Sequence, residues 1–240
     1  MSERTTDQDR LPDASPLKTP RAAALAGIVF SVLLIAALVI LRLATPSDPA
    51  VVGSWLADPA RRAAVVTALN FIPFAGIAFL WFIGVVRDRI GRREDRFFAT
   101  VFLGSGLLFV GMLFVAAALA GGVIAEAGAA HAGSSNRGIL SLGRNVTSLL
   151  VNIYAIRMAA VFTLTTVTIA RRTAIVSRWL TLSGVAVALI LLIGTSISVW
   201  VELLFPAWIL ALSVDILVAG AGRRSPRVGD AAGPAGGHRG

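Results

Sequence analysis

Cysteine is absent from this chain of 240 residues, and histidine occurs only at His131 and His238. The lack of cysteine excludes disulfides, thiolate nucleophiles, iron–sulfur clusters and every zinc site that contains cysteine. Neither histidine has a second ligand at helical spacing, so bis-histidine haem and HExxH zinc sites are excluded as well. The sequence therefore predicts no metal site and no cofactor.

Charge is also scarce: 15% of the residues are charged, whereas 56% are hydrophobic. A soluble domain carries about 25% charged and about 45–50% apolar residues. Here the apolar residues form long runs, and a helix of about 20 apolar residues reaches across the hydrocarbon layer of about 30 Å. We expect an all-α fold, a polytopic transmembrane helical bundle.

Six apolar runs are long enough to cross, within one transmembrane domain over residues 22–221: Ala22–Leu41, Ala63–Val86, Phe97–Ala125, Val146–Ala170, Leu180–Ser198 and Leu203–Ala221. Merging the last two into one helix of about 40 residues would give twice the required length. Glu202 and Pro206 instead favour a new helix after a tight hairpin, because a proline in the first turn loses no hydrogen bond. The first run is longer than the apolar part of a signal peptide, and we interpret it as a retained anchor.

The ends of the chain have a different composition. Residues 1–21 mix both charge signs with prolines, and residues 222–240 are rich in glycine and proline. Neither segment can bury enough apolar surface to fold, which predicts a disordered arm and a disordered tail.

Basic residues lie mostly on one side of the predicted spans. Of the 22 lysines and arginines, 16 fall in the arm, the tail, and the second and fourth connections. Such residues are retained on the cytoplasmic side, so both termini are predicted to be cytoplasmic. The preference for arginine over lysine, beside abundant alanine, valine and glycine, is associated with GC-rich bacterial genomes, which predicts a bacterial plasma membrane.

Two connections have features of binding segments. The basic stretch from Arg87 to Arg96 could bind nucleic acid or anionic lipid, but its topogenic role and its three acidic residues explain it without a ligand, and we expect no nucleic acid as a partner. Residues 126–145 read as a flexible external connector, in which Ile139, Leu140 and Leu142 form a short amphipathic piece that could reach the interface. A lid over an outward-facing cavity is the alternative interpretation of that connector.

Two ionisable residues fall inside spans, where a charge needs a partner or a water-filled cavity. Counted from the predicted outer surface, Arg157 and Asp215 lie about 16 Å and 18 Å deep, on helices that run in the same direction. Matching depths predict an Arg157–Asp215 ion pair. It would serve either to fix the register of two helices or to line a site.

A second polar group consists of Asn70, Asn152 and Tyr154. Pro73 should kink the second span and free a carbonyl near Asn70. Asn70 and Asn152 have similar predicted depths, so their amides are expected to meet, either as a hydrogen bond that holds the bundle or as part of a solute site.

The fourth span carries polar side chains around most of its circumference and is expected to be the most buried span. Its threonines are expected to bond to their own helix. Small residues recur at Gly104, Gly111 and Ala118, and again at Gly184 and Ala188, where they would allow close contact between helices.

The stretches FIPFAGIAFLWFIGVVRDRIGRREDRFF and FPAWILALSVDIL are the most distinctive in the chain. With them the chain resembles uncharacterised six-span integral membrane proteins of high-GC bacteria, a resemblance that implies no activity. There is no G-x-S-x-G motif, P-loop or carboxylate pair at catalytic spacing, so an enzyme is not expected. We expect a non-enzymatic bundle subunit or interaction protein, in contact with the lipid bilayer and with a protein partner or a second copy. The alternative is a small-solute channel or carrier with a site formed by Arg157, Asp215, Asn70, Asn152 and Tyr154.

Overall fold

The structure, a computed structural model, describes residues 19–45, 58–90, 96–129, 137–173, 177–194 and 200–222. Every regular element in these ranges is helical, which confirms the all-α fold class. The elements are α1 (Thr19–Ala44), α3 (Pro59–Ile90), α4 (Arg96–Ala129), α5 (Arg137–Leu149), the π-helical turn η3 (Leu150–Ala155), α6 (Ile156–Thr173), α7 (Arg178–Ile193), the 3-10 turn η5 (Val201–Leu203) and α8 (Leu204–Gly222).

Within these ranges, five helical segments are long and apolar enough to cross a membrane: Arg21–Ala44, Pro59–Arg87, Phe97–Glu126, Leu140–Arg171 and Val201–Ala219. The expected fifth span is shorter, since α7 has 16 residues and a length of only about 24 Å. Gly194 ends this helix as its C-cap. Residues 195–198 of the expected span lie outside the described ranges.

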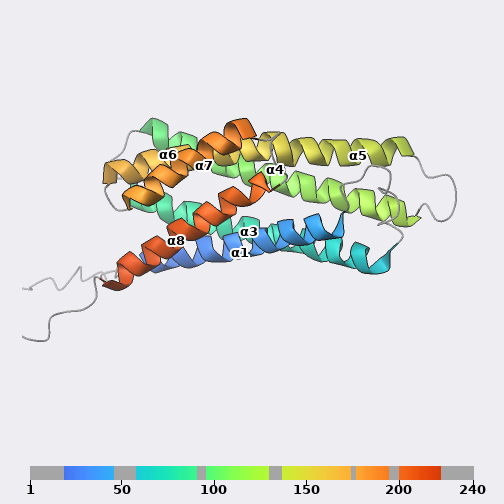
Figure 1. Cartoon of the computed structure of the whole chain (residues 1–240), viewed down its shortest axis with the longest axis horizontal. Helices are drawn as coiled ribbons and strands as arrows, with labels where there is room; N and C mark the ends of the chain where they lie inside the picture. The colour runs from blue at the N-terminus through green and yellow to red at the C-terminus, as the bar shows by residue number, and fades with distance from the viewer. Residues whose placement is uncertain are drawn as a thin grey trace, which may run out of the picture.

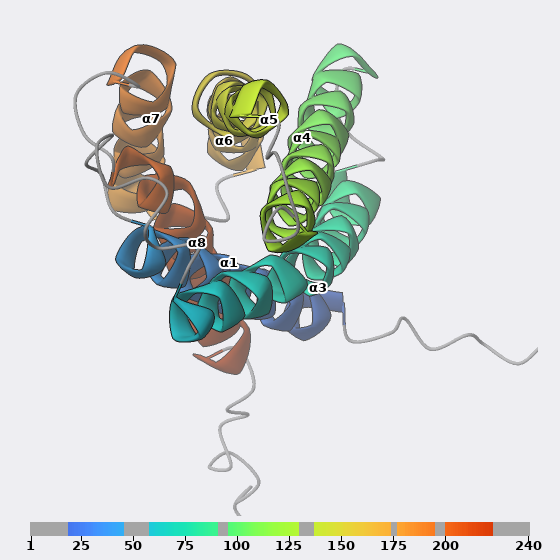
Figure 2. The same ribbon diagram turned by 90° about the vertical axis from the view of Figure 1, so that its right-hand side faces the viewer.

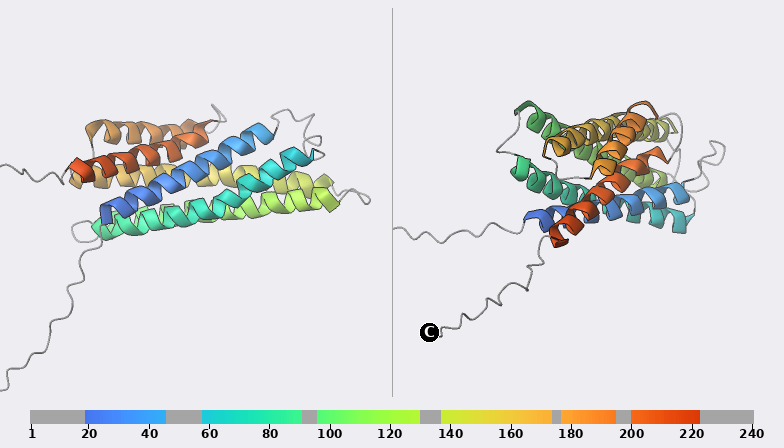
Figure 3. Two further views of the ribbon diagram at one scale, coloured as in Figure 1. Left: turned by 90° about the horizontal axis from the view of Figure 1, so that it is seen from below. Right: turned by 60° about the vertical axis from the view of Figure 1, so that its left-hand side comes forward.

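Helices α5 and α6 continue one another through η3, and with these taken as one helix the helices alternate in direction along one axis (Figure 1). The beginning of α1 and the end of α8 lie at the same end of the bundle. Seen along that axis, α1, α3 and α8 form one layer and α4, α6 and α7 form the other (Figure 2). Within the first layer α1 lies between α8 and α3 (Figure 3, left). Helices that follow one another in the chain are therefore also neighbours in space.

Local signals account for where helices begin. The Asp58 carboxylate accepts a hydrogen bond from the backbone N–H of Ala60 at 2.9 Å, and Pro59 occupies the first position of α3, where a missing N–H costs nothing. Ser177 caps α7 by accepting from the backbone N–H of Leu180. Pro206 lies in the first turn of α8, as expected.

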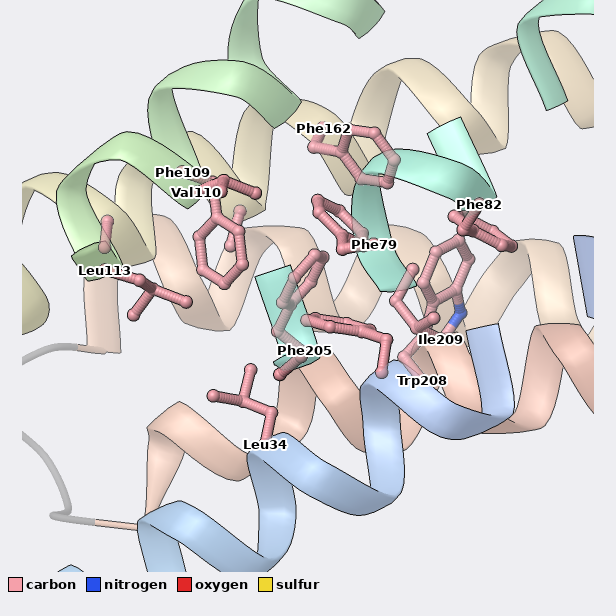
Figure 4. Packing of buried hydrophobic residues seen from close by; sticks show 14 of the residues in the cluster. Leu34, Phe79, Phe82, Phe109, Val110, Leu113, Phe162, Phe205, Trp208 and Ile209 are labelled. Atoms are coloured by element: carbon pink, nitrogen blue, oxygen red, sulfur yellow. The ribbon is translucent and has the colours of Figure 1, made fainter. Parts of the chain in front are cut away.

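The centre of the bundle is filled by phenylalanine. Phe79 on α3 contacts the rings of five others, with centroid distances from 4.4 Å to Phe30 to 6.1 Å to Phe82. Seven of the 12 phenylalanines form one connected cluster that joins α1, α3, α4, α6 and α8 (Figure 4): Phe30, Phe79, Phe82, Phe102, Phe109, Phe162 and Phe205. Offset and edge-to-face ring pairs are each worth about 0.5–1.5 kcal/mol beyond area burial. We name this set the phenylalanine core.

Close helix contacts depend on small residues only at some of the expected positions. A Cβ at Gly184 would lie 2.7 Å from the ring of Trp208 on α8 and would also meet Val167 on α6, and Ala188 is fully buried. The prediction for α7 is therefore confirmed. The prediction for α4 is wrong within this chain, because a Cβ at Gly104 or Gly111 would meet no atom within 4 Å.

The connector expected between residues 126 and 145 is largely helical. Helix α4 continues to Ala129, and α5 begins at Arg137 and joins η3 and α6 without a break. The correction has a simple cause: α5 is amphipathic, and its Gly143 lies against Val123 of α4, so the segment is stabilised by packing and not by hydropathy. The expected amphipathic piece is thus part of a longer helix.

The expectation that the fourth span is the most buried is confirmed. In its most apolar stretch 56% of the residues are buried, against 22% to 39% in the other four segments. The hydroxyls of Thr163, Thr165, Thr166 and Thr168 all donate to carbonyls four residues earlier, at 2.7–2.9 Å. The polarity of these four hydroxyls is satisfied inside the helix, as expected.

The expected arm and tail fall almost entirely on residues 1–18 and 223–240, outside the described ranges. Only their innermost residues are described, and these already belong to α1 and α8.

Candidate functional site

The expected Arg157–Asp215 pair does not form. The Arg157 guanidinium donates from Nη1 to the backbone carbonyl of Ile153 at 3.0 Å, within its own helix. Asp215 is half-buried on α8, and the ion pairs in the described part of the chain do not include it. Helix α6 packs mainly against α4 and α7 and meets α8 only over a short stretch, which includes the contact of Phe162 with Phe205. Equal depth did not place the two charges on facing sides.

The expected meeting of amides does not occur either. Asn70 is exposed on α3, while Asn152 donates from Nδ2 to Ser148 Oγ at 3.0 Å along its own helix. Helix α3 packs mainly against α1 and α4, and it contacts α6 through Phe79 and Phe162 in the phenylalanine core. Tyr154 is 54% exposed, on the outer side of the bundle. The five expected site residues are therefore not brought together.

Pro73 lies at an exposed position inside α3, which is helical on both sides of it. The proline removes one helical hydrogen bond. Asn70, the expected partner of the freed carbonyl, is likewise exposed, so the kink and its compensation stay predictions.

A different pair of charges meets inside the bundle. The Arg42 guanidinium, in the last turn of α1, donates from Nη2 to Glu202 Oε1 on η5. The Glu202 side chain is only 9% exposed, whereas that of Arg42 is 32% exposed. The pair connects η5, which precedes α8, to the end of α1. The arginine is the more exposed partner.

A narrow cavity of about 20 Å³ lies beside this pair, with room for roughly one water. Its wall includes Glu202, and the other side chains are apolar: Leu34, Leu38, Phe109, Leu113, Val151, Ala155, Ile156, Ala159, Leu191 and Phe205. These residues come from α1, α4, η3, α6, α7 and η5–α8, so the cavity lies where most of the elements converge.

The π-helical turn η3 forms one side of that cavity through Val151 and Ala155. The backbone N–H of Ile156 donates to the carbonyl of Val151, five residues earlier, instead of to the usual acceptor four residues earlier. Such turns occur often at functional positions in helices. The Arg157 side chain covers the Ile153 carbonyl of the same turn, so the unusual backbone is partly satisfied by a side chain.

The sequence contained a signal for the Arg42–Glu202 pair that depth counting missed. Arg42 directly follows the first expected span, and Glu202 directly precedes the sixth. Both positions are predicted to lie at the same membrane surface, where one charge of each sign can pair. Charged residues at the ends of the predicted spans were thus a better guide to ion pairing than charged residues in their middles.

Comparison of the chain with family models, with curated proteins and with solved structures gives no match. The candidate site consists of the Arg42–Glu202 pair, the small cavity whose wall includes Glu202, and the π-helical turn η3, which forms part of the same wall.

Proposed function

We propose that the chain is a multi-pass protein of the bacterial plasma membrane, with six crossings and both termini in the cytoplasm. Five segments have the required length and hydropathy. Helix α7 is about 6 Å shorter than the hydrocarbon layer, a mismatch that a bilayer accommodates by local thinning. An even number of crossings is supported by the position of the first and last helices, because the beginning of α1 and the end of α8 lie at the same end of the bundle (Figure 1).

In this membrane the protein acts as a non-enzymatic subunit or interaction protein that binds the transmembrane helix of a partner. The observation that carries this proposal is the outer face of α4. It is the least covered of the five segments, with 22% of its most apolar stretch buried. On this face Gly111 and Ala118 are exposed, and Gly104 and Gly111 meet no other helix of the chain. Small residues seven apart let another helix approach closely.

The alternative, a small-solute channel or carrier, draws less support. Its expected residues Arg157, Asn152 and Tyr154 interact within their own helix or face outward. The phenylalanine core fills the centre of the bundle, and the cavity beside Glu202 holds roughly one water. A binding role for the outside of the bundle is therefore the better-supported function.

Photocrosslinking in cells tests the partner-binding proposal. A photoreactive phenylalanine analogue is placed at Leu108 or Ala118 on the outer face of α4, and as a matched control at Leu182 on α7, which is 64% exposed. We expect a crosslinked product of defined mass from the two α4 positions and none from the α7 position. Absence of a product at α4, or equal products at all three positions, would contradict the proposal.

A further inference from the structure

The end of the bundle that carries the beginning of α1 also carries four exposed arginines of the described helices: Arg21, Arg87, Arg171 and Arg178 (Figure 1). The ion pairs in the described ranges, Arg42–Glu202 and Arg61–Asp58, both lie toward the other end. The positive charge of these four side chains is therefore not balanced by either pair.

Two of the four arginines frame one corner of this end. Arg171 lies in the last turn of α6 and Arg178 is the first residue of α7, and α6 and α7 pack directly against each other. Both side chains project from the ends of adjacent helices. Two guanidinium groups at one corner provide donors that match the oxygens of a phosphate.

Below this corner α7 has two contrasting faces. Gly184, Ala188 and Leu191 are buried against neighbouring helices. The opposite face is apolar and exposed along the whole helix: Trp179 at 83%, Leu182 at 64%, Leu189 at 51% and Ile193 at 76%. In a bilayer this face contacts acyl chains, and Trp179 next to Arg178 has the position of a tryptophan at the boundary between headgroups and hydrocarbon.

We propose that the corner formed by Arg171 and Arg178 binds the phosphate of an anionic phospholipid, whose acyl chains lie on the exposed face of α7. The proposal rests on the membrane insertion proposed above. Charge complementarity selects an anionic headgroup, and the apolar face of Trp179, Leu182 and Leu189 selects a lipid over a free phosphate. Because α7 is shorter than the hydrocarbon layer, the bilayer is expected to thin around it.

Lipid titration of the whole purified protein in detergent micelles tests the site, with bound lipid counted by native mass spectrometry. We expect phosphatidylglycerol to bind wild type at least tenfold more tightly than phosphatidylcholine. Two arginines near the membrane surface together raise the affinity for an anionic lipid by about 30-fold. The double variant R171Q/R178Q should lose about that factor, and R171K/R178K should retain most of the affinity because the charges remain.

The matched control is R62Q/R144Q, which removes two arginines from the other end of the bundle and should leave phosphatidylglycerol binding unchanged. Equal losses in both double variants would show an effect of net charge alone and overturn the site. So would a wild type without preference for the anionic lipid. Displacement of phosphatidylglycerol by equimolar glycerol 3-phosphate would show a phosphate site that does not need the lipid, which also overturns the proposal.

A micelle has no sides, so the orientation proposed above does not affect this measurement. If lipid binds but the orientation is wrong, only the proposed topology fails. If the orientation is correct but no lipid binds, only the lipid site fails.

Discussion

The contact of Arg42 with Glu202 joins the end of α1 to η5, the turn that precedes α8. An ion pair that is partly removed from water gains attraction but loses hydration, so the intact pair contributes little net stability. Removing one partner is different, because the other charge remains in an apolar environment without compensation. The asymmetry between single and double substitution is thus the signature of this pair.

We predict that Glu202→Gln lowers the free energy of unfolding by about 1–3 kcal/mol, because it leaves the Arg42 guanidinium without its charged acceptor. The double variant Arg42→Met with Glu202→Gln should be more stable than the sum of the single effects implies, by at least about 1 kcal/mol. Unfolding by sodium dodecyl sulfate from mild detergent, followed by circular dichroism, gives these values.

Arg61→Gln serves as the control for the charge-pair prediction. Arg61 Nε and Asp58 Oδ2 are 3.4 Å apart, and both side chains are more than 40% exposed. This pair should therefore contribute less than about 0.5 kcal/mol to the free energy of unfolding. Strictly additive effects of the Arg42 and Glu202 substitutions would contradict the proposed role of their contact.

Which charges pair could be predicted only in part. Hydropathy and residue counting locate Arg157 and Asp215 inside their spans, and both do lie in helices of membrane-spanning length. Counting along a helix gives depth, however, and says nothing of rotation about the helix axis or of the order of helices in the bundle. Phe162 of α6 contacts Phe205 of α8 and Phe79 of α3, so these helices do meet. Arg157 nevertheless bonds within its own helix and Asn70 is exposed, so equal depth was not enough for either pair.

At the scale of the helix, small residues have two different uses in this bundle. Gly184 on α7 lies against Val167 and Trp208 of two neighbouring helices, whereas Gly111 on α4 faces outward. Both helices carry small residues at helical spacing, seven apart in α4 and four apart in α7. This pattern indicates that a close approach is allowed, and the partner can be inside the chain or outside it.

We predict opposite effects of the same substitution at these two glycines. Gly184→Ala should destabilise the fold by about 1–3 kcal/mol, since its Cβ would crowd Trp208 at 2.7 Å. Gly111→Ala should leave the purified protein equally stable or more stable by up to about 1 kcal/mol, because alanine favours the helix and meets no neighbour. The same unfolding titration measures both variants. Equal destabilisation by the two substitutions would be inconsistent with the described packing of α4 and α7.

At the scale of the whole molecule, the length of apolar runs predicted the all-α bundle and the approximate position of every described helix except α5. What it could not predict is that α7 stops at Ile193, that α5 continues α6 outward, and that the phenylalanine core joins the two layers. The first depends on the Gly194 cap, the second on packing of Gly143 against Val123, and the third on which side of each helix faces inward. Each is a property of side-chain geometry that mean hydropathy does not record.

The central claim is that the chain crosses the membrane an even number of times and that α5 lies on the outer side. Because the natural chain has no cysteine, single cysteines at Ser2, Ser141 and Ser225 can be labelled without background. With a membrane-impermeant maleimide on intact spheroplasts, we predict labelling at position 141, and labelling at positions 2 and 225 only after the membrane is permeabilised. Labelling of one terminal position but not the other in intact spheroplasts would mean an odd number of crossings and would contradict the account.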